Sequence, residues 1–346
     1  MSKRKVRALV LFSGGLDSMM AVKLLQDQDI EVEAICFVSN FFNSVKAERG
    51  AKILEIRLHI VDISREILKL VKDPPNGHGK NYNPCIDCHG LMIKKAGEFL
   101  ERSNKFDFLA SGEVLGQRPF SQNKESLKKV SDISGYEILR PLSAKLLDET
   151  EVERKRLVKR EKLANILGRR RDIQFELARK YKIEEYPSPA GGCLLTDPQF
   201  SNNLGEMIQN WSKSRPRDIE LLKTGRIYWL NLKKEGKALV VVGRNEEENK
   251  ILEKIRQKND FVLKLKDIDG PTTLVRFFDF DLSDKVIEKV EEKEIKVKIP
   301  KNFKKDDLKL DKDKTLNKVL EISGLLTGWY YTRARGKKVN IKLEIK

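Results

Sequence analysis

The sequence predicts a doubly wound α/β domain with a parallel sheet, followed by a smaller C-terminal α+β domain. Three observations support this fold class. Short apolar runs alternate with helical patterns over residues 6–142, a glycine-rich turn follows the first run, and closely spaced strands appear from about residue 226. The chain of 346 residues is also longer than one hydrophobic core usually supports.

The first domain is expected to alternate strands and helices. Runs of aliphatic and aromatic residues predict strands over residues 6–12, 32–39, 57–63, 106–112 and 136–142. Helical periodicity predicts the helices between them, over residues 17–28, 64–72 and 90–103. Strands joined through helices pair in parallel, with helices on both faces of the sheet. A ligand of such a sheet binds at the carboxyl ends of the strands, at a switch point in the strand order.

The rest of the chain is divided by its composition. Residues 148–183 are expected to be helical, with an interruption at Gly168. Strands are expected over residues 226–232, 237–244, 261–268 and 272–280, with a helix over 245–258. We therefore predict domains over 1–185 and 216–283, a proline- and glycine-containing linker over 186–215, and a charged C-terminal region without an assigned role over 284–346.

The charge and hydropathy of the chain bear on its partners and location. A net charge of +17 makes nucleic acid the first partner to consider, and a lysine-rich surface without a partner is the alternative. No apolar stretch approaches the roughly 20 residues that cross a bilayer, and the first apolar run is too short for a secretory signal. We expect a cytoplasmic protein with no membrane partner and with reduced cysteines.

A glycine-rich turn, SGGLDS at residues 13–18, joins the first expected strand to the first helix. Two glycines let the backbone turn tightly and bring its amides close to an anion, and the helix N-terminus adds a partial positive charge. The turn lacks the lysine of the P-loop and does not fit the dinucleotide fingerprint. We predict a phosphate-binding loop, with an ordinary capped glycine turn as the alternative.

This turn resembles the SGGxDS loop of the PP-loop ATP pyrophosphatases, which adenylate a carbonyl oxygen and release pyrophosphate. The resemblance implies an adenine nucleotide alpha-hydrolase-like fold that binds ATP and Mg²⁺. It places the pyrophosphate and its magnesium against Ser13, Gly14, Gly15, Asp17 and Ser18. Phe37 and Val38, at the end of the second expected strand, are candidates for contact with adenine.

Three of the four cysteines form a candidate functional set. Cys36 lies in an apolar strand pattern and is expected to be a small core residue. Cys85 and Cys88 stand three positions apart, and the dipole of the helix that follows is expected to favour the thiolate of Cys88. Cys193 lies in a glycine-rich segment that allows a bulky ligand to approach. A structural disulfide is disfavoured in a reducing compartment.

Four interpretations of these cysteines stay open from the residues alone. A thioredoxin-like pair does not need Cys193, and a zinc site would add His78 or His89 as a ligand. A 4Fe-4S cluster held by Cys85, Cys88 and Cys193 uses all three thiolates and leaves one iron open, and we prefer it. A catalytic dithiol would carry a persulfide on Cys193, resolved by Cys88, and would leave Cys85 without a role.

A wider resemblance covers roughly residues 6–197. The string CIDCHGLMIKKAGEFLERSNKFDFLASGEVLGQRPFSQ, followed by ILRPLSAK, resembles the core of the tRNA thiouridine synthases. GEVLGQ and RPL are most similar to 4-thiouridine synthases, whereas NPCIDC is also similar to the NPDxxC of 2-thiouridine synthases. Cluster-dependent members of this superfamily carry the CxxC…C pattern found here. The resemblance implies a tRNA uridine sulfurtransferase, with 4-thiouridine as the favoured product.

Two departures from the 4-thiouridine synthases concern tRNA and the sulfur donor. Those enzymes carry an RNA-binding region ahead of the loop, and twelve residues precede Ser13 here. No cysteine follows Cys193, so a rhodanese domain is not expected, and inorganic sulfide or a cysteine desulfurase is the expected donor. The stretch KALVVVGRNEEEN faintly resembles an RNA-binding module of NFACT proteins.

The reaction implied by this resemblance adenylates a uracil carbonyl oxygen with ATP. Sulfide held on the open iron then attacks the activated carbon and expels AMP. Arg118, Lys145 and Arg140 are the expected cations near the strand ends; Arg118 is the first choice, with a loop-fixing salt bridge as its alternative role.

Further contacts with nucleotide and tRNA are expected around these residues. Gln117 and Ser121 are candidates for nucleotide contact, and Gly112 and Gly116 would let the backbone approach the ligand. The target base must leave its stack, so the protein must hold the tRNA backbone. The densest basic run is the candidate for this, with a solvated helix face as the alternative: Arg154, Lys155, Arg156, Lys159, Arg160, Lys162, Arg169, Arg170 and Arg171, with Leu157, Leu163 and Leu167 facing inward.

Other functions stay open. A 2-thiouridine synthase or a persulfide-dependent thiolase would keep the adenylation, and a PP-loop ligase would use an amine nucleophile and leave the cysteines unexplained. A non-catalytic ATP- and RNA-binding iron–sulfur protein and an enzyme that removes sulfur are further alternatives. The choice between inorganic sulfide and a cysteine desulfurase stays open, as do the position of the target uridine and the choice between a monomer and a homodimer.

Overall fold

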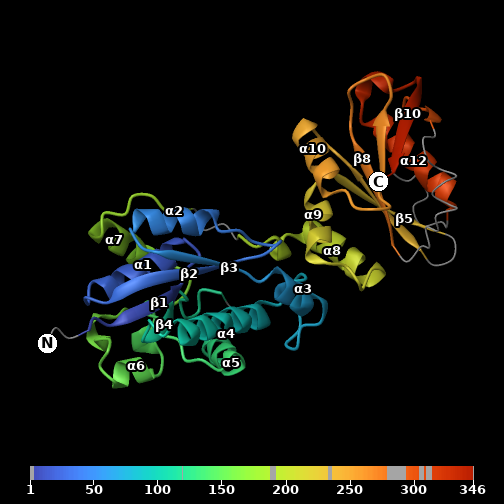
Figure 1. Ribbon diagram of the computed structural model, residues 1–346. Coiled ribbons are helices and arrows are strands. Elements are labelled where there is room, and N and C mark those ends of the chain that lie inside the picture. The colour runs from blue at the N-terminus through green and yellow to red at the C-terminus, as the bar shows by residue number, and fades with distance from the viewer. Residues whose placement is uncertain are drawn as a thin grey trace. The chain divides into compact units, whose positions relative to one another are not determined.

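The computed structural model describes residues 4–118, 120–187, 192–232, 236–278, 294–303, 308 and 314–345. The chain divides into two compact units, residues 1–201 and 202–346, each built on its own sheet (Figure 1). None of the described helices has both the length and the apolar character needed to cross a membrane.

The first unit contains a four-stranded parallel sheet. Its strands are β1 (Arg7–Leu11), β2 (Glu31–Val38), β3 (Leu58–Asp62) and β4 (Phe108–Ser111), in the order β3-β2-β1-β4. The chain builds outward from β1 to β3 and then returns to place β4 on the other side of β1. The switch point therefore lies between β1 and β4, where the loop after β1 emerges.

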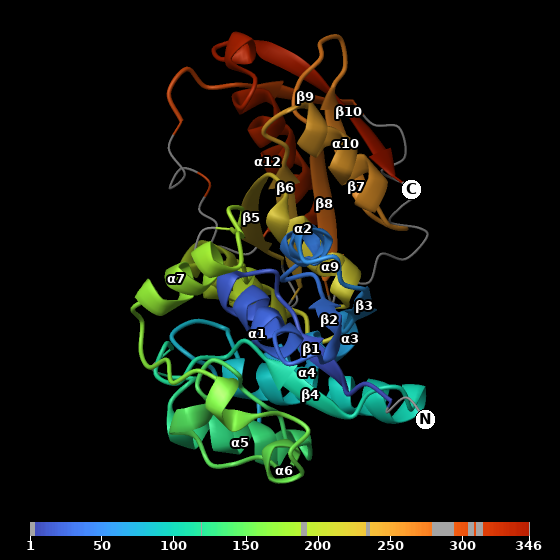
Figure 2. The same ribbon diagram turned by 90° about the vertical axis from the view of Figure 1, so that its left-hand side faces the viewer.

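Helices cover both faces of this sheet, as the doubly wound prediction requires. Helices α1 (Leu16–Gln26), α2 (Val45–Ile53) and α7 (Asp172–Lys180) lie on one face, and α4 (Cys85–Ser103) and α5 (Lys124–Ser134) lie on the other (Figures 1 and 2). Helix α3 (Ser64–Lys72) follows β3. Met19, Met20 and Cys36 are buried in the core between sheet and helices, so the core role predicted for Cys36 is confirmed.

Two expected elements of the first unit are largely absent. The strand expected over 136–142 is reduced to one bridge between Ala110 and Leu139, because Pro141 has no N–H to extend the ladder. The helices expected over 148–183 shrink to α6 (Glu151–Arg154), a short 3₁₀ turn and α7. Arg156 adopts a left-handed φ of 56°, which ends α6 and sends the chain into irregular structure.

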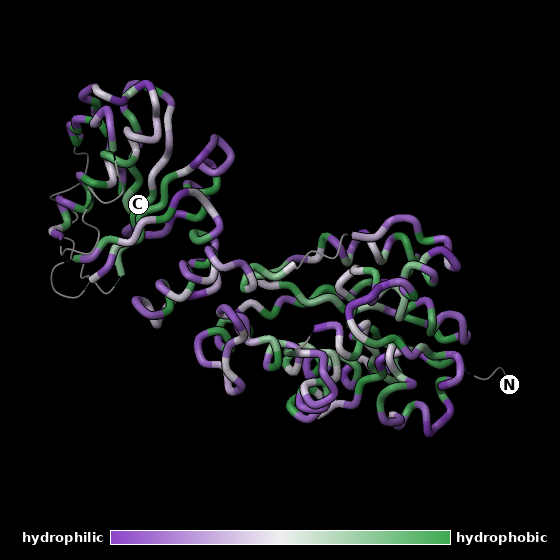
Figure 3. Tube along the Cα trace, turned by 180° about the vertical axis from the view of Figure 1, so that it is seen from behind, coloured by the Kyte–Doolittle hydropathy of each residue, from purple (hydrophilic) through white to green (hydrophobic). Residues whose placement is uncertain are grey.

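The second unit is α+β, as predicted. Its strands β5 (Arg226–Asn231), β6 (Lys237–Val242), β7 (Phe261–Leu265), β8 (Thr273–Phe278), β9 (Glu294–Lys298) and β10 (Lys338–Ile345) pair antiparallel in the order β5-β6-β8-β7-β10-β9. The helices are α8 (Pro198–Asn210), which begins in the first unit, α9 (Pro216–Lys223), α10 (Glu246–Ile255) and α12 (Leu316–Trp329). The apolar stretches coloured in Figure 3 follow the inner strands of each unit.

Two predicted boundaries differ from this arrangement. The described residues of the predicted charged region 284–346 do not stand apart, because β9 and β10 complete the same sheet as β7. The predicted linker 186–215 contains α8, and residues 188–191 of that linker lie outside the described residues.

Candidate nucleotide and thiol site

The turn at residues 13–18 connects β1 to α1 with the geometry of an anion cradle. Gly14 has a φ of +71°, and a Cβ there would lie 2.0 Å from the backbone oxygen of Lys46, so no larger residue fits. Gly15 is the N-cap of α1, and no side chain caps this helix. The Ser18 hydroxyl donates to the Gly15 carbonyl over 2.8 Å and steadies the turn. The first N–H groups of α1 are therefore oriented to receive an anion.

Asp17, in the first turn of α1, is surrounded by donors. Its Oδ1 accepts from Gln174 Nε2 at 3.1 Å, and its Oδ2 accepts from Gln117 Nε2 at 3.0 Å and from Arg171 Nη2 at 3.5 Å. A carboxylate at this position repels a bound phosphate unless a cation stands between them. Its oxygens are of the type that Mg²⁺ prefers, and phosphates usually supply further ligands of that ion.

Two residues near Asp17 were not anticipated as parts of the site. Gln174 is fully buried on α7, and its Oε1 has no hydrogen-bond partner. Arg171 was expected to contact tRNA, and it reaches Asp17 instead. Both come from a segment 154 or more residues along the chain from Asp17, and no local pattern marks them.

The glycines and strand ends around the turn have mixed roles. A Cβ on Gly112 would lie 2.6 Å from the backbone of Ser18, so the chain leaving β4 packs directly against α1. Gly116, at a φ of +75°, packs near Gly168. At the end of β2, Phe37 is 6% exposed and Val38 is half-buried, which leaves Val38 the more accessible of the two.

The three cysteines meet at the carboxyl edge of this sheet. Cys85 opens α4, and Cys88 lies in its first turn. The segment carrying Cys193 is tied to the sheet by the Leu194 N–H, which donates to the Phe41 carbonyl at 2.9 Å, and by the Asn81 amide, which donates to the Thr196 carbonyl at 2.9 Å. The thiols are close enough to influence one another electrostatically.

Burial raises the pKa of two of these thiols, those of Cys88 and Cys193. It raises the pKa of Cys88, and neighbouring Cys193, Cys85 and Asp87 raise it further. It also raises the pKa of Cys193 to about 11, although Arg118 acts in the opposite direction. The prediction that the helix dipole favours the Cys88 thiolate is wrong, because desolvation outweighs the partial charge of a helix end.

The three thiols are soft donors of the kind that the predicted cluster would need. Among the described residues, no group of three or more His, Cys, Asp or Glu side chains is arranged to hold one ion. His89 Nδ1 contacts Glu113 and His78 Nε2 contacts the Val71 carbonyl, and each ring has a second nitrogen that could bind a metal ion. Three soft thiols match a cluster with one open iron. The Asn83 amide donates to Cys85 Sγ at 3.1 Å, a contact of the kind that tunes such clusters.

Glu113, in the GEVLGQ segment, is the centre of a buried ionic network that the sequence did not reveal. Its Oε2 accepts from Arg140 Nε at 3.0 Å and from the Ser111 hydroxyl at 3.1 Å, and its Oε1 lies 3.0 Å from His89 Nδ1. Burial opposes the charge of this carboxylate. The Arg140 charge and the hydrogen bonds from His89 and Arg140 prevail, and they lower the pKa of Glu113 to about 2.

This network predicts acid sensitivity. The pKa of Glu113 falls from an ordinary 4.5 to about 2 on folding, so the unfolded chain binds the proton first as the pH drops. The stabilisation is complete above about pH 5 and disappears as the pH approaches 2. We expect Glu113→Gln to lower the free energy of unfolding at pH 7 by about 3 kcal/mol, because Arg140 loses its buried counterion. The difference from wild type should shrink toward pH 3.

Urea unfolding followed at several pH values measures this effect. Glu151→Gln is the matched control, since Glu151 is an exposed carboxylate that pairs with Lys155 on the surface of α6. Equal losses for the two variants at pH 7, or a Glu113 effect that does not depend on pH, would contradict the prediction.

The three basic residues expected to bind phosphate differ in whether their side chains are free to do so. Arg118 is exposed and close enough to Cys193 to influence its charge. Arg140 is 8% exposed and paired with Glu113, so its predicted availability for phosphate is wrong. Lys145 donates to the Glu161 carbonyl at 2.8 Å. Ser121, a candidate for nucleotide contact, is buried.

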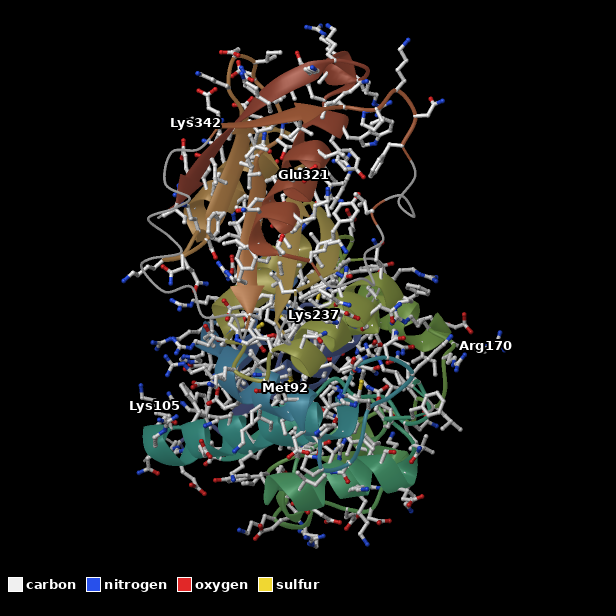
Figure 4. All side chains as sticks on the ribbon, turned by 90° about the vertical axis from the view of Figure 1, so that its right-hand side faces the viewer. Met92, Lys105, Arg170, Lys237, Glu321 and Lys342 are labelled. Atoms are coloured by element: carbon white, nitrogen blue, oxygen red, sulfur yellow. The ribbon has the colours of Figure 1, made fainter. Side chains whose placement is uncertain are left out.

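The basic run over 154–171 is also partly occupied. Ion pairs join Lys155 to Glu151, Arg160 to Glu153 and Arg170 to Asp172, although Arg170 projects outward (Figure 4). Leu163 is buried, but Leu167 is 63% exposed, so the predicted inward apolar stripe is wrong. An irregular chain path places these side chains on no common helix face.

Comparison with known proteins gives a partial match. Residues 4–156 match the family model described as thiamine biosynthesis protein (ThiI). A probable tRNA sulfurtransferase of Anoxybacillus flavithermus is 32% identical over 155 residues, which cover 42% of this chain and 37% of the relative. One of Acholeplasma laidlawii is 29% identical over 152 residues, which cover 39% and 34%. The chain thus spans about a third of the length of these relatives.

Solved structures show weaker similarity. A 4-thiouridine synthetase in complex with RNA and ATP is 22% identical, with a TM-score of 0.37, and the match covers 63% of this chain and 52% of that one. A predicted subunit of a tRNA methyltransferase from Methanocaldococcus jannaschii is 23% identical, with a TM-score of 0.30, and the match covers 39% and 69%. The resemblance to tRNA sulfurtransferases predicted from the motifs is confirmed by the matches to the family model and to the curated relatives.

Proposed function

From the similarity of residues 4–156 to tRNA sulfurtransferases, we propose that the protein is an ATP-dependent tRNA uridine sulfurtransferase. One observation carries the proposal. The segment after β4 reaches both halves of the site, since Gln117 donates to Asp17 in the glycine turn and its neighbour Arg118 lies near Cys193. A nucleotide site and a thiol site held by adjacent residues suit the activation of a carbonyl and its replacement by sulfur.

The residues of the glycine turn act in the first half of the reaction. The N–H groups at the start of α1 bind the phosphates of ATP, and Asp17 with Mg²⁺ holds the departing pyrophosphate. The uracil carbonyl oxygen forms a bond to the α-phosphorus as the bond to pyrophosphate breaks. Arg118 stabilises the charge that develops on the phosphate. The product is an adenylated base whose former carbonyl oxygen leaves readily with AMP.

The second half of the reaction forms the carbon–sulfur bond and breaks the carbon–oxygen bond, and AMP departs. Cys85, Cys88 and Cys193 would hold a 4Fe-4S cluster, since their soft thiols are the donors that such a group requires. When bound, the cluster would supply sulfur at the sulfide level, either directly from inorganic sulfide or from the persulfide of a cysteine desulfurase after a thiol reductant has supplied two electrons. In the alternative without a cluster, Cys193 carries a persulfide and Cys88 resolves it.

We further propose 4-thiouridine as the product, since GEVLGQ and RPL are most similar to 4-thiouridine synthases. We propose the cytoplasm as the location, since the proposed substrate, tRNA, is found there. A 2-thiouridine product is the second candidate, because NPCIDC keeps part of the motif of those enzymes.

The test is anaerobic incubation with ATP, Mg²⁺, sulfide and unmodified tRNA, followed by mass spectrometry of the nucleosides and by pyrophosphate measurement. We expect 4-thiouridine and pyrophosphate in equal amounts. If the product is 2-thiouridine, the protein is a 2-thiouridine synthase rather than the favoured 4-thiouridine synthase. Pyrophosphate release with a nitrogen-containing product, or tRNA binding with no turnover under any sulfur donor, would overturn the proposal.

A further inference from the structure

Six exposed basic side chains gather at one end of the sheet in the second unit. They lie at the end of β9 and in the connection between α12 and β10, and together they are called the β9–β10 patch: Lys298, Lys301, Arg333, Arg335, Lys337 and Lys338. Figure 4 labels Glu321 on α12 and Lys342 on β10, the two elements whose connection carries most of the patch. The match to the family model, over residues 4–156, covers no part of it.

Backbone pairing holds these side chains together. Lys298 and Lys338 are direct partners in the β9–β10 ladder. The Ile299 N–H donates to the Lys337 carbonyl at 2.8 Å, and the Ile299 carbonyl accepts from the Gly336 N–H at 2.9 Å. A Cβ on Gly336 would lie 3.1 Å from Cγ of Lys301, so the Lys301 side chain crosses this turn.

The patch lacks the neutralisation found elsewhere in the same sheet. Nearby Lys264, Lys266 and Lys342 pair with Glu253, Glu294 and Glu344. In the part of the chain that the structure describes, none of the six patch side chains forms an ion pair. The sequence holds no Asp or Glu between Glu321 and Glu344. Like charges directly opposite across a ladder destabilise a sheet, as Lys298 and Lys338 do here. An anionic partner would reverse that cost.

Aromatic rings lie beside these cations. The Arg335 guanidinium stands over the Trp329 ring at 4.1 Å and donates to the Trp329 carbonyl at 3.2 Å, and the Phe303 ring is 5.1 Å from Trp329. The Arg226 guanidinium stands over Tyr330 at 4.1 Å. Stacking fixes the Arg335 fork in one orientation, which favours hydrogen bonds to phosphate. Basic grooves with aromatic platforms are typical of sites for single-stranded or looped RNA.

We propose that the β9–β10 patch binds the phosphate backbone of RNA, and its identification as tRNA rests on the proposed function. RNA is favoured over an anionic membrane because no strongly exposed large apolar side chain accompanies the patch among the described residues. The base-modifying site lies in the first unit, so the patch contributes affinity and register while the chemistry takes place elsewhere.

The test compares two triple variants of the full chain. The patch variant is Lys298→Gln, Lys337→Gln and Lys338→Gln. The matched control is Lys250→Gln, Lys264→Gln and Lys318→Gln, which removes the same charge from lysines paired with Glu246, Glu253 and Glu321. Binding of unmodified tRNA is followed by fluorescence anisotropy over a range of salt concentrations, and thermal melts establish that both variants fold.

The patch variant should bind tRNA at least about 10-fold more weakly, and the slope of log affinity against log salt should fall by about 2 to 3. The control should keep most of the affinity and slope. Replacing the same three lysines with arginine should restore binding. Equal behaviour of the two triple variants would overturn the proposal, and so would patch-dependent binding to anionic vesicles without binding to tRNA.

The binding assay is independent of thiolation, so the two proposals fail separately. Loss of tRNA binding in the patch variant would support the patch even if wild-type protein made no thiouridine. If wild-type protein forms thiouridine normally and the patch variant binds tRNA as wild type does, the proposed function stands and the proposed RNA-binding role of the patch is contradicted. Trp329 offers a second readout, because tRNA that displaces or orders Arg335 should change its fluorescence, and Trp329→Phe should remove that change.

Discussion

Asp17→Asn should lower ATP-dependent pyrophosphate release by about 100-fold or more while leaving tRNA affinity unchanged. The carboxylate accepts hydrogen bonds from Gln117, Gln174 and Arg171 and offers a charge to a bridging cation. An asparagine amide keeps the shape but presents an NH₂ group to these donors and contributes no charge to the cation. The loss corresponds to about 2.7 kcal/mol of transition-state stabilisation. Pyrophosphate release and tRNA anisotropy measure the two quantities separately.

Asp27→Asn is the control for this change. Asp27 is a partly exposed carboxylate of the same unit, bonded to Tyr181 and Lys180, and its conversion should leave pyrophosphate release within about 2-fold of wild type, as is usual for surface sites. If Asp17→Asn released pyrophosphate at the wild-type rate, the glycine turn would not be the site of adenylation. If it lost tRNA binding as well, the assignment of Asp17 to the nucleotide alone would be wrong.

Cys85→Ala should abolish thiouridine formation and leave tRNA-dependent pyrophosphate release in place. This variant separates the two sulfur routes, because a cluster requires all three thiolates, whereas the dithiol route uses only Cys88 and Cys193. Under the cluster route, iron and acid-labile sulfide in anaerobically purified protein should fall to near zero in the Cys85, Cys88 and Cys193 alanine variants alike. Thionucleoside yield, iron and sulfide are the measurements.

Cys36→Ala is the control for Cys85→Ala, because it removes a thiol outside the candidate site. Cys36 lies on β2 and is 5% exposed in the core, so this variant should keep its iron and its thiolation, with at most a modest loss of stability. Full activity in Cys85→Ala, with no iron in any preparation, would favour the persulfide on Cys193. Zinc in place of iron would make the thiol site structural.

Local sequence patterns predicted the parts of the site that depend on neighbouring residues. The turn at residues 13–18 was located because a buried strand, two glycines and a helix start follow one another directly. The position of Cys85 and Cys88 near the start of a helix was also predicted from neighbouring residues, although the helix begins at Cys85 itself rather than near residue 90.

The missed features depend on contacts between distant segments. Gln174 and Arg171 reach Asp17 only after the chain has crossed the sheet, and the Glu113 network joins α4, the end of β4 and the segment near residue 140. The Cys88 prediction failed for a related reason. A helix start is visible in the sequence, but the depth at which the thiol is buried is not, and burial decides the pKa.

Gln117 and Arg118 are neighbours in the sequence, and each bears on a different part of the candidate site. Neighbouring residues are separated by one peptide unit of about 3.8 Å, which cannot stretch. Gln117 donates to Asp17, and Arg118 is close enough to Cys193 to influence its charge, so one short segment after β4 bears on both the glycine turn and the thiol site. A residue inserted between these two positions is therefore expected to disturb the Gln117 contact with Asp17 or the approach of Arg118 to Cys193.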